Sequence, residues 1–197
     1  MTQIGTLPSI TTTIADRTPM ACTTTTPTQR PTPRLSKSDF KQLMAHWCTG
    51  VAVVTTAAAG EPVGCTVNAI TSVSLEPPLL LVGLAAGSRT LAAIREQRRL
   101  GVNLLSAQQV GLARQFSHGD PAGRFAGVDY RWAEGVPVLS EVVVATLCVA
   151  ERFLPVADHV LVIAAPVWSR STPRRRPLVC YGRSYWSLWS MGVVGRR

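Results

Sequence analysis

Short polar side chains alternate along one segment of the chain, from residue 64 to residue 78. Four residues of one parity carry them: Thr66, Asn68, Ser72 and Ser74. Alternate residues of a β-strand face the same side, so these groups could hydrogen-bond a flat, heteroatom-rich ring and its phosphate tail. The same alternation is typical of a half-buried strand, with Val67, Ala69 and Val73 packed on the core. The pattern alone leaves both interpretations open.

Other groups that commonly carry catalysis are few and far apart. The three histidines are His46, His118 and His159, and none has a second ligand at metal spacing. The sequence contains no P-loop, no G-x-G-x-x-G fingerprint and no G-x-S-x-G elbow. The 11 Asp and Glu residues form no pair that spacing would bring together for acid–base work. We expect no metal site, and an enzyme built from this chain would need a cofactor for the difficult step.

Composition limits the class of protein and its partners. The 197 residues are 46% hydrophobic and only 16% charged, which suits one domain with a real core. Apolar stretches such as 79–86 are far shorter than the roughly 20 residues of a membrane span. The net charge of +9 comes from scattered arginines without interleaved aromatic residues, so we expect neither a nucleic-acid nor a membrane partner. Five cysteines without a C-x-x-C pair, and no secretory leader, favour a reducing cytoplasm.

The two ends of the chain differ from its middle. Residues 1–35 are rich in Thr and Pro and contain few large aliphatic side chains. Such a segment cannot bury enough apolar area to offset its ordering entropy, so we expect a disordered tail. A transit peptide is the alternative, but the prolines oppose the amphipathic helix that it would need. The expected domain covers 36–190, and 191–197 form a second tail.

The elements that must position the polar segment are mostly short strands. A helix is predicted to begin at Ser36, which has capping-box spacing to Asp39, and to end at Gly50. Its apolar face would consist of Phe40, Leu43, Met44 and Trp47. Strands are predicted over 51–56, 63–75, 79–84, 100–105, 142–152, 159–168 and 179–188, with short helices after Ser88 and Ser106 and a loop over 119–135. This order predicts a mainly β protein, an antiparallel barrel or sandwich with helices at its ends.

At this point the sequence resembles a known family. Eight short pieces, in order, are similar to the flavin reductase family of FMN-binding split-barrel proteins, which supply reduced flavin to two-component monooxygenases and halogenases. They are Phe40 with 49–56, 64–79, 88–90, 102–109, Phe116, Arg124–Phe125, Asp158–His159, and 177–178 with Tyr185. The resemblance covers about residues 38–188 and implies a six-stranded antiparallel split barrel, a Greek key, that works as a homodimer.

The resemblance also implies roles for individual residues around FMN or FAD. Thr66, Val67, Asn68 and Ala69 would contact the isoalloxazine edge, and Ser72 and Ser74 would lie near the ribityl chain or phosphate. Ser88, Arg89 and Thr90 would receive the phosphate, and Phe116 and Phe125 would wall the pocket. His159 would be the catalytic residue that faces the nicotinamide of NADH or NADPH, with Asp158 and Tyr185 beside it. Cys65 is interpreted as packing.

The chain departs from the family pattern on the nicotinamide side. Ala157 replaces a glycine before Asp158, which would discourage a left-handed backbone and shift the loop that carries His159. Ala164 replaces another usual glycine, Pro166 cannot donate to a strand ladder, and Cys180 stands where Tyr is common.

The function that the resemblance implies is an NAD(P)H:flavin oxidoreductase. It would transfer a hydride to FMN or FAD and supply the reduced flavin by diffusion to a monooxygenase or halogenase. This reaction needs orientation and backbone donors rather than a metal or a protein nucleophile, which agrees with the scarcity of catalytic side chains. The change at Ala157 motivates an alternative, a flavin-binding module without turnover. A barrel that binds an anionic polymer through arginine clusters is a third hypothesis.

Overall fold

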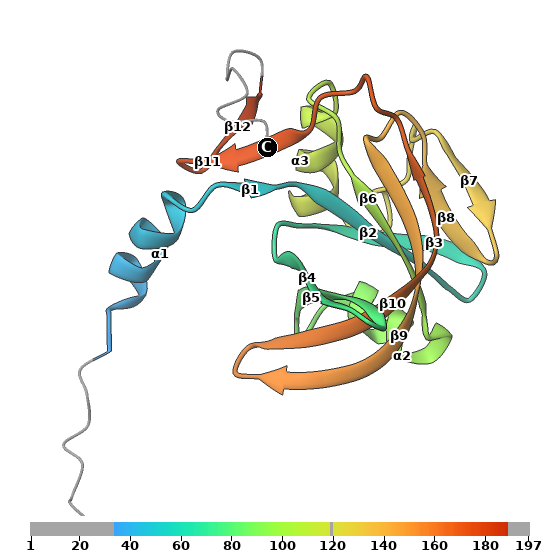
Figure 1. Ribbon diagram of the computed structural model, residues 1–197, viewed down its shortest axis with the longest axis horizontal. Coiled ribbons are helices and arrows are strands. Elements are labelled where there is room, and N and C mark those ends of the chain that lie inside the picture. The colour runs from blue at the N-terminus through green and yellow to red at the C-terminus, as the bar shows by residue number, and fades with distance from the viewer. Residues whose placement is uncertain (1–33, 119, 189–197) are drawn as a thin grey trace, which may run out of the picture. The chain divides into compact units, whose positions relative to one another are not determined.

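The computed structural model describes residues 34–118 and 120–188, and it is mainly β (Figure 1). Both expected tails, apart from residues 34 and 35, lie outside this range. The helices are α1 (Lys37–Ala45), α2 (Arg89–Gln97) and α3 (Val110–His118). The strands are β1 (Thr49–Gly50), β2 (Ala52–Ala58), β3 (Glu61–Val67), β4 (Ile70–Leu75), β5 (Pro78–Ala85), β6 (Arg99–Leu104), β7 (Tyr130–Ala133), β8 (Val136–Leu139), β9 (Val144–Val156), β10 (His159–Ser171), β11 (Leu178–Tyr181) and β12 (Ser184–Ser187).

Seven strands form the main sheet, in the order β3-β2-β6-β9-β10-β5-β4, and every neighbouring pair is antiparallel. The predicted mainly β, antiparallel split barrel is confirmed. The seventh strand arises because segment 63–75, predicted as one strand, is two. β3 ends at Val67 on one edge of the sheet, and β4 begins at Ile70 on the other edge.

The break between β3 and β4 is held by β5. The Gly83 amide donates a hydrogen bond to the Ala69 carbonyl at 2.8 Å. Glycine is needed there because a Cβ atom on Gly83 would lie 3.0 Å from the Cβ of Ala69. The strand break also changes the predicted face: β4 has a register shift between Ser72 and Ser74, and Val73 is 52% exposed rather than packed on the core.

Two buried clusters form the core. One fills the barrel and includes Val54, Leu84, Ile94, Leu100 and Val162. The other lies under α3 and the β7–β8 hairpin and includes Val53, Leu105, Phe116, Leu139 and Leu178. Successive residues Val53 and Val54 therefore serve different clusters, as expected for a strand that is covered on both faces.

A buried polar network ties the β7–β8 hairpin to the barrel. The side-chain amide of Asn103 donates to the Val53 carbonyl and to Thr55 Oγ1, both at 3.1 Å, and its oxygen accepts from the Leu139 amide. The Thr55 hydroxyl in turn donates to the Pro137 carbonyl at 2.6 Å. The first strand of this hairpin lies within the stretch 119–135 that the sequence predicts to be a loop, so that prediction is wrong for 130–133.

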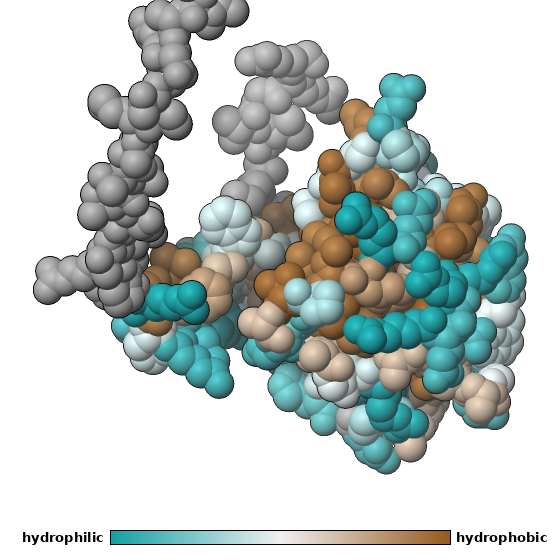
Figure 2. All heavy atoms as spheres, turned by 90° about the horizontal axis from the view of Figure 1, so that it is seen from below, coloured by the Kyte–Doolittle hydropathy of each residue, from teal (hydrophilic) through white to brown (hydrophobic). Residues whose placement is uncertain are grey.

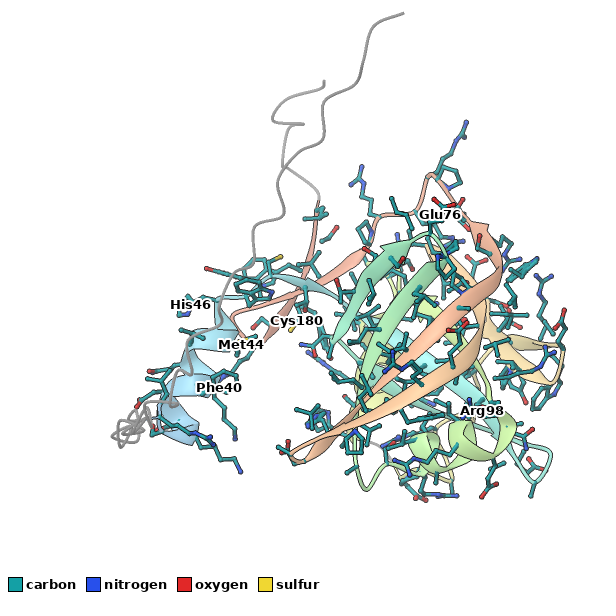
Figure 3. All side chains as sticks on the ribbon, turned by 60° about the horizontal axis from the view of Figure 1, so that its bottom comes forward. Phe40, Met44, His46, Glu76, Arg98 and Cys180 are labelled. Atoms are coloured by element: carbon teal, nitrogen blue, oxygen red, sulfur yellow. The ribbon has the colours of Figure 1, made fainter. Side chains whose placement is uncertain are left out.

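The first predicted helix forms, but it ends at Ala45 rather than at Gly50, and its apolar face is uncovered. Ser36 caps α1 by accepting from the Asp39 amide at 3.1 Å. None of the α1 residues is buried, and Trp47 beyond its end is 67% exposed. Figure 3 shows Phe40 and Met44 on this helix, outside the barrel. α1 leads into a separate three-stranded sheet, β1-β11-β12, and the Gly182 amide donates to the Ala45 carbonyl at 2.7 Å.

Two expectations about turns are corrected. The helix that was expected directly after Ser106 begins only at Val110, and the Ser106 amide donates to Gln109 Oε1 at 2.9 Å. Ala157 keeps the left-handed backbone that alanine was expected to prevent, with φ 52°. The turn between β9 and β10 confines this position, so the local cost of alanine is outweighed by the two paired strands. Pro166 is accommodated by a register shift between Pro166 and Trp168.

Candidate functional site

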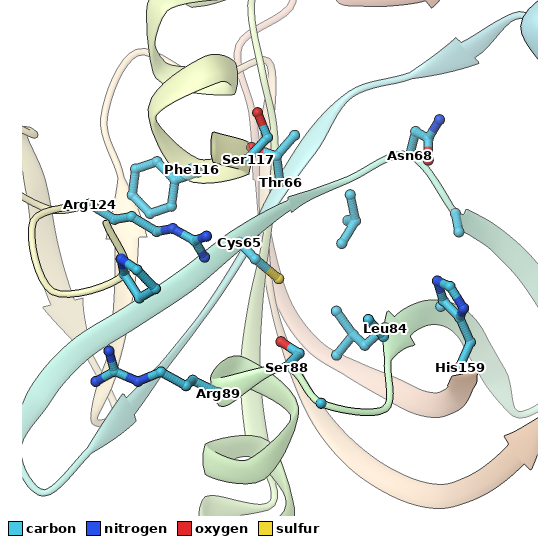
Figure 4. A pocket seen from close by; sticks show the side chains of 16 residues that line it. Cys65, Thr66, Asn68, Leu84, Ser88, Arg89, Phe116, Ser117, Arg124 and His159 are labelled. Carbon is cyan, nitrogen blue, oxygen red and sulfur yellow. The ribbon is translucent and has the colours of Figure 1, made fainter. Parts of the chain in front are cut away.

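A cavity of about 580 Å³ opens beside the end of β3. Its wall combines β3, the β3–β4 break, the end of β5, the start of α2, the end of α3 and the first residue of β10. The lining residues are Cys65, Thr66, Val67, Asn68, Ala69, Gly83, Leu84, Ala85, Gly87, Ser88, Arg89, Phe116, Ser117, Pro121, Arg124 and His159. Figure 4 shows Arg89 and Arg124 at one end and Asn68 and His159 at the other.

The floor of the cavity is the end of β3. Val67 is the last residue paired with β2, so Asn68 and Ala69 lie outside the strand ladder and are exposed. The Thr66 hydroxyl donates to the Ala113 carbonyl at 2.7 Å, which anchors α3 over the strand. Asn68 also lines three smaller cavities beside this one. The floor thus offers backbone polar groups and one amide side chain to a bound ring.

The end with Arg89 and Arg124 is suited to an anion. Ser88 caps α2, and its hydroxyl accepts from the Leu91 amide at 3.4 Å. The first amides of a helix have no partner within it, and the helix dipole is positive there. Arg124 approaches from the loop after α3, and its Nη1 donates to the Gly64 carbonyl at 2.9 Å. The 16 lining residues include no carboxylate, so the electrostatics of this end favour a phosphate.

Cys65 turns its sulfur toward the interior of the cavity (Figure 4). Burial raises the pKa of this thiol, and hydrogen bonds with Thr90 and Ser88 offset only part of the effect. A protonated thiol is a poor nucleophile, which agrees with the interpretation of Cys65 as packing.

Phe116 forms the aromatic wall and is fully buried. Phe125 packs edge-on behind it, with ring centroids 4.9 Å apart, and does not line the cavity. The chain of ring contacts continues through Tyr130 to Trp132, at 5.2 and 5.9 Å. Phe116 is therefore held in place from behind by the loop and β7.

The opposite end is built on the turn between β9 and β10. His159 is the first residue of β10 and pairs with Val156 and with Ala85 of β5. Its Nδ1 lies 2.8 Å from Asp158 Oδ1. The pKa of the Asp158 carboxyl is lowered by this hydrogen bond, by the charge of His159 and by Lys37.

The structure gathers eight of the residues predicted for the site and places the others elsewhere. The eight are Thr66, Val67, Asn68, Ala69, Ser88, Arg89, Phe116 and His159. Ser72 and Ser74 lie on β4, beyond the strand break, because the single predicted strand is two. Thr90 is 2% exposed, and Asp158 does not line the cavity. Tyr185 lines a smaller cavity with Asn68.

Sequence reasoning missed Ser117, Pro121 and Arg124 as lining residues. A signal for Arg124 was available, because it belongs to the matched piece Arg124–Phe125, in which only Phe125 had an assigned role. Within the residues that the structure describes, no group of three or more His, Cys, Asp or Glu residues could hold a metal ion. No described helix is long and apolar enough to cross a membrane.

Comparison with known proteins identifies this arrangement. Residues 44–188 match the model of the flavin reductase like domain. The chain belongs to this family. The match includes the end of α1, the barrel and the strands β11 and β12, and thus every residue that lines the cavity.

Three similar proteins from this flavin reductase family illustrate the relationship. An NADH:riboflavin 5'-phosphate oxidoreductase from Streptomyces pristinaespiralis is 35% identical over 78% of this chain and 89% of its own. A probable flavin reductase from Rhizobium meliloti is 41% identical over 63% of this chain, and the match spans only 40% of that relative. The crystal structure of nitrilotriacetate monooxygenase component B from Mycobacterium thermoresistibile has a TM-score of 0.76 and 28% identity, covering 81% of this chain and 92% of that one.

The residues present fit the flavin that the family implies. The cavity joins a polar backbone floor to a cation-lined end, as a ring with a phosphate tail requires. Because the floor is formed by residues outside the ladder, its donors are not all used by neighbouring strands.

Proposed function

We propose that this flavin reductase family member is an NAD(P)H:flavin oxidoreductase that reduces FMN or FAD. The observation that carries the proposal is the cavity itself, which has an anion-binding end, an aromatic wall, an open strand end and a histidine, and no carboxylate in its lining. A bound flavin would supply the acceptor for a hydride from the nicotinamide. The protein's task is then to orient two rings and to exclude water, which requires no protein nucleophile.

We assign the roles of the chain's residues by their place in the cavity. The α2 N-terminus with Ser88 and Arg89, together with Arg124, would bind the flavin phosphate. Residues 66–69 would hold the ring edge, and Phe116 would close the side. His159, half-exposed at the opposite end, would face the nicotinamide. Ser72, Ser74, Thr90, Phe125 and Tyr185 would act only indirectly, by supporting these groups.

A direct assay tests this proposal. The purified full chain is mixed with FMN or FAD under anaerobic conditions, and NADH or NADPH is added. Loss of the visible flavin absorbance, with stoichiometric oxidation of the nicotinamide, supports the proposal. Flavin binding without nicotinamide oxidation in all four combinations would instead support the flavin-binding module. The backbone of Ala157 argues against that alternative, because the turn keeps its left-handed conformation.

The reduced flavin is proposed to serve a partner monooxygenase or halogenase. Similar proteins support this role, since one is a monooxygenase component. The floor of the cavity is open at Asn68, so a reduced flavin can leave without unfolding the barrel. A dialysis membrane between the reductase and a flavin-dependent oxygenase distinguishes diffusion from direct contact: product should still form across the membrane.

We also propose a homodimer that works in the cytoplasm. Fifteen large hydrophobic side chains are exposed among the described residues, and seven of them come from segments 40–47 and 181–188. Figure 2 shows further apolar side chains gathered on the face of the barrel. Such clustering is unusual on a monomer and fits a second copy. Light scattering should give twice the chain mass, and Leu43→Asp should give a monomer. The four described cysteines are free thiols, as expected in a reducing compartment.

A further inference from the structure

The turn between β9 and β10 presents two neighbouring side chains in different ways. His159 is about half-exposed and lines the cavity, whereas the Asp158 side chain is 92% exposed and lies outside the lining. The cavity therefore presents the imidazole, and not the carboxylate, to a ligand inside it. An effect of Asp158 on a ligand within the cavity would pass through His159.

The contact between the two side chains determines which nitrogen of the neutral imidazole carries the proton. His159 Nδ1 and Asp158 Oδ1 are 2.8 Å apart, a hydrogen-bond distance. An ionised carboxylate can only accept a hydrogen bond, so the proton of a neutral imidazole must lie on Nδ1. Nε2 is then left as an acceptor. The lowered pKa of the Asp158 carboxyl keeps that acceptor ionised.

Backbone hydrogen bonds fix the position of Asp158 and His159 relative to the cavity. The Ala86 amide donates to the Asp158 carbonyl at 2.9 Å, which fastens the turn to the segment that leads into α2. His159 is paired with strands on both sides, opposite Val156 and Ala85. Ala157 has a left-handed backbone, which sets the direction of the two residues that follow.

From this geometry we infer that Asp158 is a positioning residue, which fixes the Nδ1-protonated tautomer of His159 and leaves Nε2 to accept a hydrogen bond from the nicotinamide carboxamide. The inference rests on the proposed function for the identity of the ligand. The tautomer itself is a property of the protein alone. Asp158 therefore takes no part in binding by direct contact.

Nuclear magnetic resonance of the full chain, with 15N-labelled histidine, tests the tautomer without any activity measurement. The other two histidines provide references: His46 Nδ1 lies 3.0 Å from the Gln42 carbonyl, which can only accept, and His118 Nδ1 lies 2.7 Å from the Ser117 hydroxyl. The variants His46→Gln and His118→Gln assign the signals. At alkaline pH, where the imidazole is neutral, we expect His159 to show the same Nδ1-protonated pattern as His46, and Asp158→Ala to move it toward the Nε2-protonated form.

Steady-state kinetics test the consequence for the ligand. Loss of one oriented hydrogen bond should raise the KM for NADH or NADPH about five- to tenfold in Asp158→Ala, with a smaller change in kcat. Asp158→Asn retains an acceptor oxygen and should recover part of the effect. Glu151→Ala, which removes another exposed carboxylate from β9, is the matched control and should change neither value.

The outcomes separate the inference from the proposed function. An Nε2-protonated His159 in the unaltered protein, or an unchanged tautomer in Asp158→Ala, overturns the inference. So does an unchanged KM in a variant that is otherwise active. If the unaltered protein oxidises no nicotinamide with any flavin, the proposed function fails, and the resonance experiment still decides the role of Asp158.

Discussion

The two ends of the cavity are built in contrasting ways. The end proposed to bind the flavin phosphate is formed by a capped helix and by Arg124, whose guanidinium is bonded to a carbonyl of a buried strand residue, Gly64. The end proposed to face the nicotinamide is formed by a turn whose side chains are largely exposed. At the first end, the groups available for binding stand on a helix and a loop that are attached to the buried core. At the second end, one histidine is held by local contacts within the turn. We expect substitutions at the first end to affect flavin affinity and substitutions at the second to affect the nicotinamide.

The strongest effect is expected from Arg124→Ala. It removes a positive charge from the cavity and the hydrogen bond that fastens the loop to Gly64. Charge-assisted hydrogen bonds contribute about 1.5–3 kcal/mol, so flavin affinity should fall by roughly 10- to 100-fold. Fluorescence titration of flavin measures the affinity. Arg114→Ala, which removes an exposed arginine from α3, is the control and should leave it unchanged.

Gly64→Ala tests the rigidity of the same end. A Cβ atom on Gly64 would lie 2.8 Å from the Val54 carbonyl and 3.1 Å from Phe116, so backbone or ring must shift. Overpacking of this kind should cost about 1–3 kcal/mol in the free energy of unfolding and weaken flavin binding. Gly111→Ala in α3 is the control, because a Cβ atom there meets nothing within 4 Å. The control should be slightly stabilised, as expected for alanine in a helix.

His159→Ala should affect the reaction with the nicotinamide rather than flavin binding, the opposite of Arg124→Ala. The imidazole is half-exposed and distant from Arg124 in the cavity, so flavin affinity and stability should change little. The loss of a contact to the nicotinamide should reduce kcat/KM about tenfold. An equal loss of flavin affinity in His159→Ala and Arg124→Ala would show that the two ends do not act separately.

Ala157→Gly gives a smaller effect. Alanine with φ 52° costs about 1–2 kcal/mol relative to its preferred backbone, and glycine removes that cost at the expense of greater freedom in the unfolded chain. A gain of under about 1 kcal/mol is expected in chemical denaturation. Ala59→Gly, at φ 51° in the β2–β3 turn, should gain a similar amount. Only the change at position 157 should alter the KM for the nicotinamide.

The smallest effect concerns pH. The pKa of Asp158 is lower in the folded chain than in the unfolded chain, chiefly because of the hydrogen bond with His159. The carboxylate therefore contributes stability above the unfolded pKa of about 4, and this contribution is lost as the pH falls through the folded value. The difference in Tm between the unaltered protein and Asp158→Asn should be present near neutral pH and vanish in strong acid.

The sequence predicted the strands better than the site. Strand positions follow from runs of β-branched and apolar residues, and thirteen of the 22 residues in the predicted strands 51–56, 79–84 and 159–168 are buried. The eight predicted residues that line the cavity came from the resemblance, because alternation over 64–78 could not tell a ligand face from a solvent face. That alternation also carried Ser72 and Ser74 into the site, since a parity argument assumes an unbroken strand. Arg124 is brought to Gly64 only by the fold, across 60 residues of chain.

The exchange of edges at Asn68 and Ala69 has a consequence for how such proteins diversify. A chain that leaves one border of a sheet and joins the other exposes main-chain polarity at the crossing, whatever side chains stand there. Recognition of a ring's rim can then survive the replacement of nearly every side chain around it. Side chains around the cavity entrance can therefore be substituted, and the preference for a hydride donor changed with them, while the barrel that supports the cavity stays the same.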